Sequence, residues 1–265
     1  MIKPSDVLQG NNLFYPWEKI IGACVFTDNK DIADRLERMG VQVGGTGTGK
    51  DLVLPHEIEH IYPDYSLYGI KDTAYGFLSR GCPRQCPFCI VANKEGTKSV
   101  KVADLSEWWS GQKNIVLCDP NILACEQSLD LLQQLVDSKA HVDVNQGLDI
   151  RLINKENIEI LNKMKVNALH FAWDNPKTDL RDKFYFYKEY GALNDHRKLR
   201  VYVLVNYWST FEEDLKRVYW LRDNGYDPYV MIYDKKNAPK RIKRLGRWVN
   251  SKFIFRACEK FEDYI

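Results

Sequence analysis

The sequence has no apolar run long enough to cross a membrane. A membrane-spanning helix needs about 20 consecutive apolar residues, and no stretch of this 265-residue chain approaches that length. The first residues, MIKPSDVLQGNNLF, also lack the apolar run of a secretion signal. We therefore expect a cytoplasmic protein with no membrane partner.

An excess of charge of one sign is also missing. The chain has 38 Lys and Arg residues against 36 Asp and Glu, a formal charge of +2, which excludes a globally basic nucleic-acid binder. One local patch stands out, because residues 235–256 contain nine Lys or Arg and no acidic residue. On a helix, a basic face would be formed by Lys236, Lys240, Lys243, Arg244 and Arg247. Nucleic acid is thus a candidate partner, but a solvated helix face or a contact with acidic region 1–70 explains the patch equally well.

Paired cysteine motifs are absent, yet cysteines cluster. The seven cysteines are odd in number and follow no export signal, so we expect no disulfide framework. Cys82, Cys86 and Cys89 lie within eight residues as CxxxCxxC. A structural zinc site usually takes four ligands in two separated pairs, and no second CxxC occurs. Three thiolates on one loop can instead hold three irons of a [4Fe–4S] cluster and leave the fourth iron open to a ligand.

From residue 71 onward, short apolar runs alternate with amphipathic stretches such as 129–136, 158–164 and 211–221. The apolar runs are 74–78, 115–118, 142–144, 168–173, 201–205 and 229–233. This alternation predicts strand–helix units and a parallel sheet. Six units are too few for a closed eight-stranded barrel, so we expect an α/β fold with a partial (βα)6 open barrel. Ligands of such sheets bind at the carboxyl ends of the strands.

Region 1–70 predicts a small N-terminal α/β segment, with strands near 23–26 and 41–43 and a helix over 30–39. We therefore divide the chain into this region, a barrel over 71–235 and a basic extension over 236–265. In the extension, we expect the aromatic residues to anchor it on the barrel rather than stack on bases. These residues are Trp248, Phe253 and Phe255.

Two motifs in region 1–70 point to other chemistry. Residues 44–50 nearly spell a phosphate-binding loop, but Asp51 stands where Ser or Thr should hold magnesium, and Pro55 follows instead of a helix. The segment from His56 to His60 matches the HExxH pattern of zinc proteases. It is short and has no obvious third ligand, so we favour a turn of structural helix.

The cysteine motif, with aromatic Phe88 before its last cysteine and a predicted strand before it, resembles that of the radical S-adenosylmethionine (SAM) superfamily. The resemblance covers residues 71 to about 235. It implies that Cys82, Cys86 and Cys89 bind a [4Fe–4S] cluster whose open iron chelates SAM. It further implies reductive cleavage of SAM to a 5′-deoxyadenosyl radical that abstracts hydrogen, with electrons from a donor such as flavodoxin or ferredoxin. Phe88 is a candidate to shield the cluster and contact the cofactor.

The resemblance also suggests cofactor residues at the ends of the second and third strands. Asp119 and Asn121 stand where relatives hold the SAM amino group, although this sequence lacks the two glycines usual there. After the third strand come Gln146, a candidate cofactor ligand, and Asp149 and Arg151, candidate catalytic residues. Arg151 can clamp a carboxylate through its bidentate guanidinium, or it can be a solvated charge at a helix start.

Three further candidates follow the later strands. Asp174 is a candidate catalytic residue that binds ribose hydroxyls or a substrate amine, or else a helix N-cap. Asn206 resembles the polar residue that contacts the SAM ribose in relatives. Tyr233 lies where relatives place the adenine, although a tyrosine there can also be a core residue.

Region 1–70 resembles, more weakly, a shortened N-terminal domain of the cobalamin-binding and methylthiotransferase-like branch. The cobalamin motif DxHxxG and a second cysteine trio are both missing, so we expect neither cobalamin nor that type of sulfur insertion. An auxiliary cluster of Cys118, Cys125 and Cys258 is left open. The alternative to an enzyme is a non-catalytic nucleic-acid-binding protein with a structural metal site. For an enzyme, the basic extension favours a nucleic-acid or nucleotide substrate.

Overall fold

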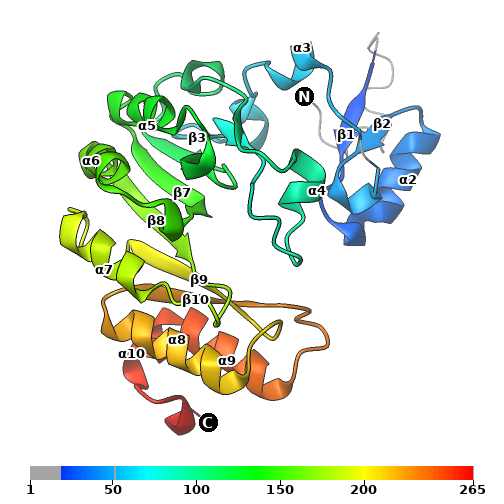
Figure 1. The fold of residues 1–265 in the computed structure, drawn as a ribbon. Helices are drawn as coiled ribbons and strands as arrows, with labels where there is room; N and C mark the ends of the chain where they lie inside the picture. Colours follow the sequence, from blue (N-terminus) through cyan, green and yellow to red (C-terminus); the bar gives the residue numbers. More distant parts are fainter. Residues whose placement is uncertain (1–18, 51, 265) are drawn as a thin grey trace. The chain divides into compact units, whose positions relative to one another are not determined.

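The computed structural model describes residues 19–50 and 52–264, and the chain divides into two compact units between Lys71 and Asp72. In the first unit, strand β1 (Ile21–Ala23) pairs in parallel with β2 (Gln42–Gly44), and helix α2 (Lys30–Arg38) connects them (Figure 1). The helix ends before Gly40, whose φ of 86° suits a residue without Cβ. The small core consists of Cys24, Ala33, Leu36, Val41 and Val43.

The glycine-rich run that begins at the end of β2 packs closely against the backbone that follows β1. A Cβ on Gly45 would lie 2.6 Å from the Cys24 carbonyl oxygen, and one on Gly47 would lie 2.4 Å from the Phe26 carbonyl oxygen. These glycines therefore allow close approach of two backbone segments. A 3-10 turn over Thr46–Thr48 follows, in place of the helix that a phosphate-binding loop requires.

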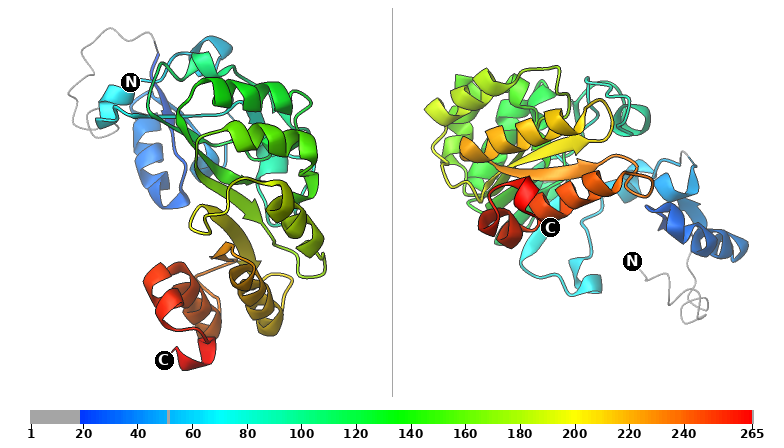
Figure 2. Two further views of the ribbon diagram at one scale, coloured as in Figure 1. Left: turned by 90° about the vertical axis from the view of Figure 1, so that its left-hand side faces the viewer. Right: turned by 90° about the horizontal axis from the view of Figure 1, so that it is seen from below.

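The second unit contains the predicted open barrel. Six strands hydrogen-bond in the order β10-β9-β8-β7-β6-β3, and every neighbouring pair is parallel. They are β3 (Thr73–Gly76), β6 (Asn114–Leu117), β7 (His141–Leu148), β8 (Val166–Ala172), β9 (Leu199–Val205) and β10 (Asp227–Ile232). Each contains or overlaps one of the apolar runs, so the fold prediction is confirmed. The sheet curves as an open half-barrel (Figures 1 and 2).

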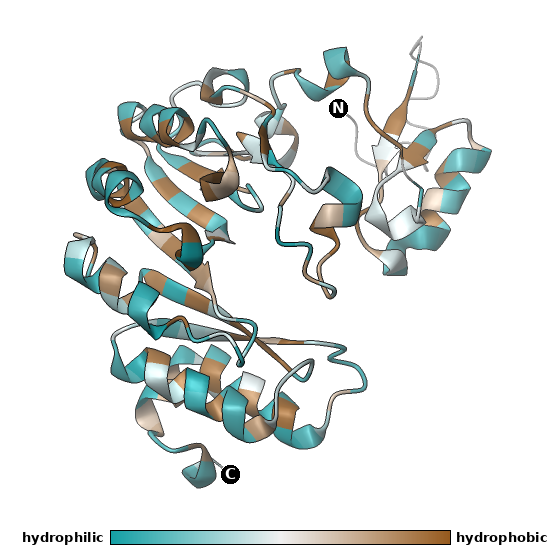
Figure 3. Cartoon of the chain, viewed as in Figure 1, coloured by the Kyte–Doolittle hydropathy of each residue, from teal (hydrophilic) through white to brown (hydrophobic). Residues whose placement is uncertain are grey.

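Helices cover the outer face of this sheet (Figure 2). They are α5 (Ser128–Asp137), α6 (Lys155–Lys163), α7 (Arg181–Tyr190), α8 (Phe211–Asp223), α9 (Lys240–Asn250) and α10 (Lys252–Ala257). In α5, Leu131, Leu132 and Leu135 are fully buried, as expected for the apolar stripe of an amphipathic helix. Figure 3 shows hydrophobic residues along the strands and hydrophilic residues on the outer sides of the helices.

The connection from β3 to β6 differs from the other four, because no long helix covers it. Instead, β4 (Ser79–Arg80) pairs antiparallel with β5 (Val100–Lys101), and the short helix α4 (Val91–Glu95) lies between them. The CxxxCxxC segment therefore lies in an excursion between two short strands. The remaining regular elements are α3 (His56–Glu59) and the 3-10 turns Thr27–Asn29, Thr46–Thr48, Tyr65–Tyr68, Leu105–Glu107, Ile122–Ala124, Ile150–Leu152 and Phe261–Asp263.

The C-terminal segment packs on the barrel, with two corrections to the predictions. Helix α9 begins at Lys240 after Pro239, so Lys236 lies outside it and does not belong to its basic face. Trp248 and Phe255 are buried as expected, whereas Phe253 is 84% exposed and anchors nothing within the described chain. The helix approaches β10 closely, since a Cβ on Gly246 would lie 2.8 Å from the Ile232 side chain.

Among the helices of the described residues, none has the length and apolar character needed to cross a membrane.

Candidate functional site

A buried carboxylate fixes the start of the segment that carries the cysteines. Asp119, directly beyond β6, is fully buried. Its Oδ1 accepts a hydrogen bond from the Leu78 amide at 2.8 Å, and its Oδ2 accepts from the amide and the hydroxyl of Ser79 at 2.6 Å each. Burial raises the pKa of Asp119 to about 6, although these hydrogen bonds lower it. Both oxygens are therefore used to join β4 to the end of β6, which differs from the cofactor contact predicted for Asp119.

The segment from Gly81 to Cys89, here called the cysteine loop, is held by backbone contacts. Gly81 has a φ of 87°, and a Cβ there would lie 2.0 Å from the Lys98 carbonyl oxygen. The Cys82 amide donates to the Gly96 carbonyl at 3.1 Å, and the Cys89 amide donates to the Cys86 carbonyl at 2.9 Å. The last contact forms a turn over the CPFC part of the loop, so two of the cysteines are adjacent in space.

The three thiols of the loop are partly buried and not disulfide-bonded. Burial raises the pKa of the Cys86 thiol, and the charges of Asp174 and then Cys89 add to this effect, while Arg151 opposes it. Groups from beyond β7 and β8 therefore lie close enough to influence Cys86. The Asn121 Nδ2 lies 3.5 Å from the Cys82 sulfur, which adds a residue beyond β6.

Asp149 joins the cysteine loop to the end of β7. Its carboxylate accepts from the Arg84 Nε at 2.5 Å and from the Arg151 Nε at 2.6 Å, and its side chain is only 6% exposed. Burial alone would raise the pKa of Asp149, but Arg151 and then Arg84 hold it below its usual value. Two arginines therefore share one carboxylate at the end of β7. Arg151 is thus held by Asp149 while its side chain is 41% exposed, so both interpretations of this residue stay open.

Asp174 is held by a buried arginine that sequence reasoning missed. The Arg217 guanidinium, from α8, donates to the carbonyls of Trp173 at 2.5 Å, Asp174 at 2.9 Å and Leu204 at 2.9 Å, and to the Asp214 carboxylate at 2.6 Å. Arg217 is 3% exposed. It thus joins the carboxyl ends of β8 and β9. The spacing of Asp214 and Arg217, three residues apart in an amphipathic stretch, was the available signal.

The Asp174 side chain takes part in the same junction. Its Oδ1 accepts from the Leu204 amide at 3.2 Å, and burial raises its pKa. Helix α7 begins at Arg181 with Leu180 at its N-cap. The alternative interpretation of Asp174 as an N-cap is therefore wrong.

Aromatic rings close one side of the site. The Phe88 ring centroid lies 5.6 Å from that of Tyr207 and 5.4 Å from that of Trp208, and Tyr207 lies 4.6 Å from Tyr233. The Asn206 Nδ2 donates to the Tyr233 carbonyl at 3.0 Å. These contacts place Phe88 and the loop against the ends of β9 and β10. Tyr207 and Trp208 were not among the predicted site residues.

Most of the predicted residues are therefore gathered at one edge of the sheet. Gln146 lies near the end of β7 and is exposed. Its contact with a cofactor stays a prediction.

Within residues 19–50 and 52–264, no three His, Cys, Asp or Glu side chains form a group placed to bind a single metal ion. The HExxH segment is part of no such group, and its His56 and His60 rings stack with their centroids 4.1 Å apart. The same holds for Cys118, Cys125 and Cys258. A [4Fe–4S] cluster attaches each cysteine to a separate iron, so its ligands need not converge on one point.

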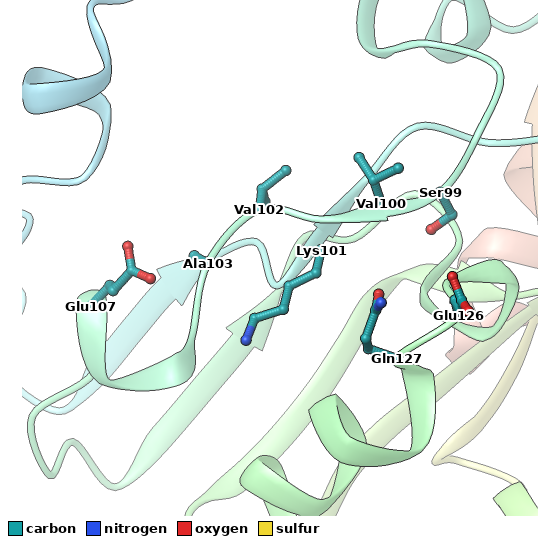
Figure 4. A pocket seen from close by; sticks show the side chains of 8 residues that line it. All are labelled: Ser99, Val100, Lys101, Val102, Ala103, Glu107, Glu126 and Gln127. Atoms are coloured by element: carbon teal, nitrogen blue, oxygen red, sulfur yellow. The ribbon is translucent and has the colours of Figure 1, made fainter.

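A cavity of about 440 Å³ lies beside β5 (Figure 4). It is lined by Ser99, Val100, Lys101, Val102, Ala103, Glu107, Glu126 and Gln127. None of the predicted site residues lines this cavity.

The basic face of α9 is partly occupied by contacts within the chain. Lys243 donates to the Lys236 carbonyl, and Arg244 donates to the Tyr264 carbonyl and lies over the Phe261 ring. These contacts hold the C-terminal residues against part of the basic face, and nucleic acid as a partner stays a prediction.

No family model and no curated protein matches the chain. Three crystal structures of SuiB from Streptococcus suis are similar to it, each at 14% identity. SuiB by itself gives a TM-score of 0.48 over 88% of this chain and 58% of SuiB. SuiB bound to S-adenosylmethionine gives 0.49 over 88% and 59%, and SuiB bound to the precursor peptide SuiA gives 0.47 over 87% and 59%. The chain thus spans less than two thirds of SuiB, and a similarity of this size carries no argument about function.

Proposed function

We propose that the protein is a radical SAM enzyme whose cysteine loop holds a [4Fe–4S] cluster. The observation that supports this most strongly is the placement of the loop across the carboxyl edge of the sheet. The loop contacts Asn121 beyond β6, Asp149 beyond β7 and Tyr207 beyond β9. Ligands of parallel α/β sheets bind at this edge, so a cofactor held by the three thiols would face the residues that follow these three strands.

The donor chemistry of the site fits this cofactor. When bound, the cluster would supply one electron to cleave SAM to a 5′-deoxyadenosyl radical. Cys82, Cys86 and Cys89 would be its ligands, because thiolates are the usual ligands of iron–sulfur clusters. The Asn121 Oδ1 is buried and has no hydrogen-bond partner within the described part of the chain. A buried acceptor without a partner is costly, and a donor such as the ammonium group of SAM would satisfy it.

The remaining residues of the site would bind and orient the cofactor and exclude water. Arg151, anchored by Asp149, can bind a carboxylate of SAM or of the substrate. Asp174 is a candidate for hydroxyl or amine groups, and Asn206 for the ribose. The rings of Phe88 and Tyr233 belong to an aromatic wall that would cover the thiols, and a dry site protects reactive intermediates from side reactions.

The reaction partners are proposed from the sequence. A nucleotide or nucleic-acid substrate is suggested by the basic extension, and an electron donor such as flavodoxin or ferredoxin by the need for one electron. The cobalamin-binding and methylthiotransferase-like branch is suggested by region 1–70 alone. A cytoplasmic location agrees with an oxygen-sensitive cofactor.

Anaerobic reconstitution of the full-length protein with iron and sulfide tests the proposal. We expect four irons per chain, and release of 5′-deoxyadenosine when SAM and dithionite are added. Cys86→Ala should lose both. Cys258→Ala is the matched control, because its thiol contacts the Lys260 carbonyl far along the chain from the loop, and it should keep both.

Zinc or no metal in the oxygen-protected wild-type protein would refute the proposal. So would a Cys86→Ala protein that still binds four irons and cleaves SAM.

A further inference from the structure

The side-chain amide of Asn121 lies beside the sulfur of Cys82. Its side chain is 2% exposed. The amide Nδ2 donates toward the Cys82 Sγ over 3.5 Å, which is within hydrogen-bond distance for the large sulfur atom.

Both partners of this contact are held in place by other interactions. The Asn121 carbonyl accepts from the Ser99 hydroxyl at 2.9 Å and from the Ala124 amide at 3.2 Å. The Cys82 amide donates to the Gly96 carbonyl at 3.1 Å. Two residues before Asn121, Asp119 holds the strand that leads into the cysteine loop. The amide and the sulfur are therefore presented to each other by fixed backbone, so little conformational entropy is lost when they interact.

The chemistry of a metal-bound cysteine decides which way the amide must face. A thiolate sulfur has no proton and can only accept a hydrogen bond. The NH₂ group of Asn121 is a donor, so the orientation in the structure suits a thiolate. Hydrogen bonds to the cysteine sulfurs are among the factors that set the reduction potential of an iron–sulfur cluster.

We propose that Asn121 is a positioning residue that donates a hydrogen bond to the Cys82 thiolate and thereby raises the reduction potential of the cluster. This inference rests on the proposed function. The reduced cluster carries one more negative charge than the oxidised cluster, so a donor at the sulfur stabilises the reduced form more. Removal of the donor must therefore make reduction by one electron less favourable.

The test is a redox titration of the reconstituted full-length protein with dithionite, followed by electron paramagnetic resonance. Asn121→Leu removes the donor at nearly constant size, and Asn121→Asp replaces it with an acceptor. We expect the ratio of reduced to oxidised cluster at a fixed potential to fall about tenfold in Asn121→Leu, equal to about 59 mV for a one-electron couple. Asn121→Asp should lower the ratio at least as far.

Ser99→Ala is the matched control. It removes a buried hydrogen bond to the same residue but leaves the amide on the sulfur, so the midpoint potential should stay at the wild-type value. A wild-type midpoint in Asn121→Leu, or an equal shift in Ser99→Ala, would overturn the inference. If Asn121→Leu binds fewer than four irons, the midpoint potential of Asn121→Asp is measured instead, and a wild-type value in that variant overturns the inference. Failure of the wild-type protein to bind a cluster refutes the proposed function instead, so the two failures are distinguishable.

Discussion

Replacement of Asp119 by asparagine should remove a specific pH dependence from the stability of the barrel unit. The carboxylate is fully buried, and its pKa is about 6 against an ordinary value of 3.8. One pKa unit corresponds to 1.36 kcal/mol. The shift of about two units is therefore linked to about 3 kcal/mol of unfolding free energy.

The sign follows from which state holds the proton more tightly. Because the pKa of Asp119 is higher in the folded protein, the folded state binds the proton more strongly between pH 3.8 and about 6. The stabilisation is fully present below pH 3.8 and is lost as the pH rises through 6. An asparagine side chain cannot titrate, so this loss should be absent from the variant.

Urea unfolding of the metal-free proteins at several pH values measures the effect. At acidic pH, Asp119→Asn should be less stable than the wild type by about 1–3 kcal/mol, because the amide cannot accept all of the bonds from Leu78 and Ser79. Between about pH 3.5 and 7, the advantage of the wild type over the variant should shrink by about 3 kcal/mol. Glu126→Gln, at an exposed carboxylate in the following loop, controls for the loss of one acidic group. A difference between wild type and Asp119→Asn that is constant across this range would refute the reasoning.

Further substitutions test the contacts that hold the site and the C-terminal segment in place. Arg217→Met leaves the buried Asp214 carboxylate without its cation, so the free energy of unfolding, measured with urea, should fall by about 3–5 kcal/mol. The double variant with Asp214→Leu should recover part of this loss of stability. Gly81→Ala places a Cβ against a backbone carbonyl at a residue with positive φ, so the free energy of unfolding should fall by about 1–3 kcal/mol. Thermal unfolding should then occur at a lower temperature, and the iron content after reconstitution should fall. Unchanged values of both would mean that the cysteine loop has another conformation. Trp248→Ala removes a fully buried ring, so the free energy of urea unfolding should fall by about 3–5 kcal/mol. Phe253→Ala removes an exposed ring and should leave that free energy within about 0.5 kcal/mol of the wild-type value. Equal losses in the two variants would contradict the packing of α9.

The strands of the barrel were predictable because each contains or overlaps a short apolar run, and β8 and β9 bury most of their residues. Parallel strands covered by helices appear as short continuous apolar runs, and β9 (Leu199–Val205) agrees with such a run to within two residues. The β4–β5 pair was not predictable in the same way. Strands of two residues have no periodicity, and their pairing depends on contacts between segments about 20 residues apart.

The candidate site was partly predictable. Spacing alone singled out Cys82, Cys86 and Cys89, because soft ligands on one loop need no information about the rest of the fold. The function of Asp119 could not be inferred in this way. A carboxylate after a strand can face a ligand or the backbone of a neighbouring strand, and only the tertiary structure shows it bonded to Leu78 and Ser79.

The sequence by itself determined the period of the strands and helices, the chemistry of the three thiols and their place after the first strand of the barrel, because these are local properties of composition and spacing. The tertiary structure decided which side chains meet the cysteine loop: Arg84 with Asp149, Phe88 with Tyr207, and Asn121 with Cys82. Such pairs join segments far apart along the chain. They form only when the curved parallel sheet brings the carboxyl ends of its strands to one edge, and that arrangement arises from the burial of the whole core.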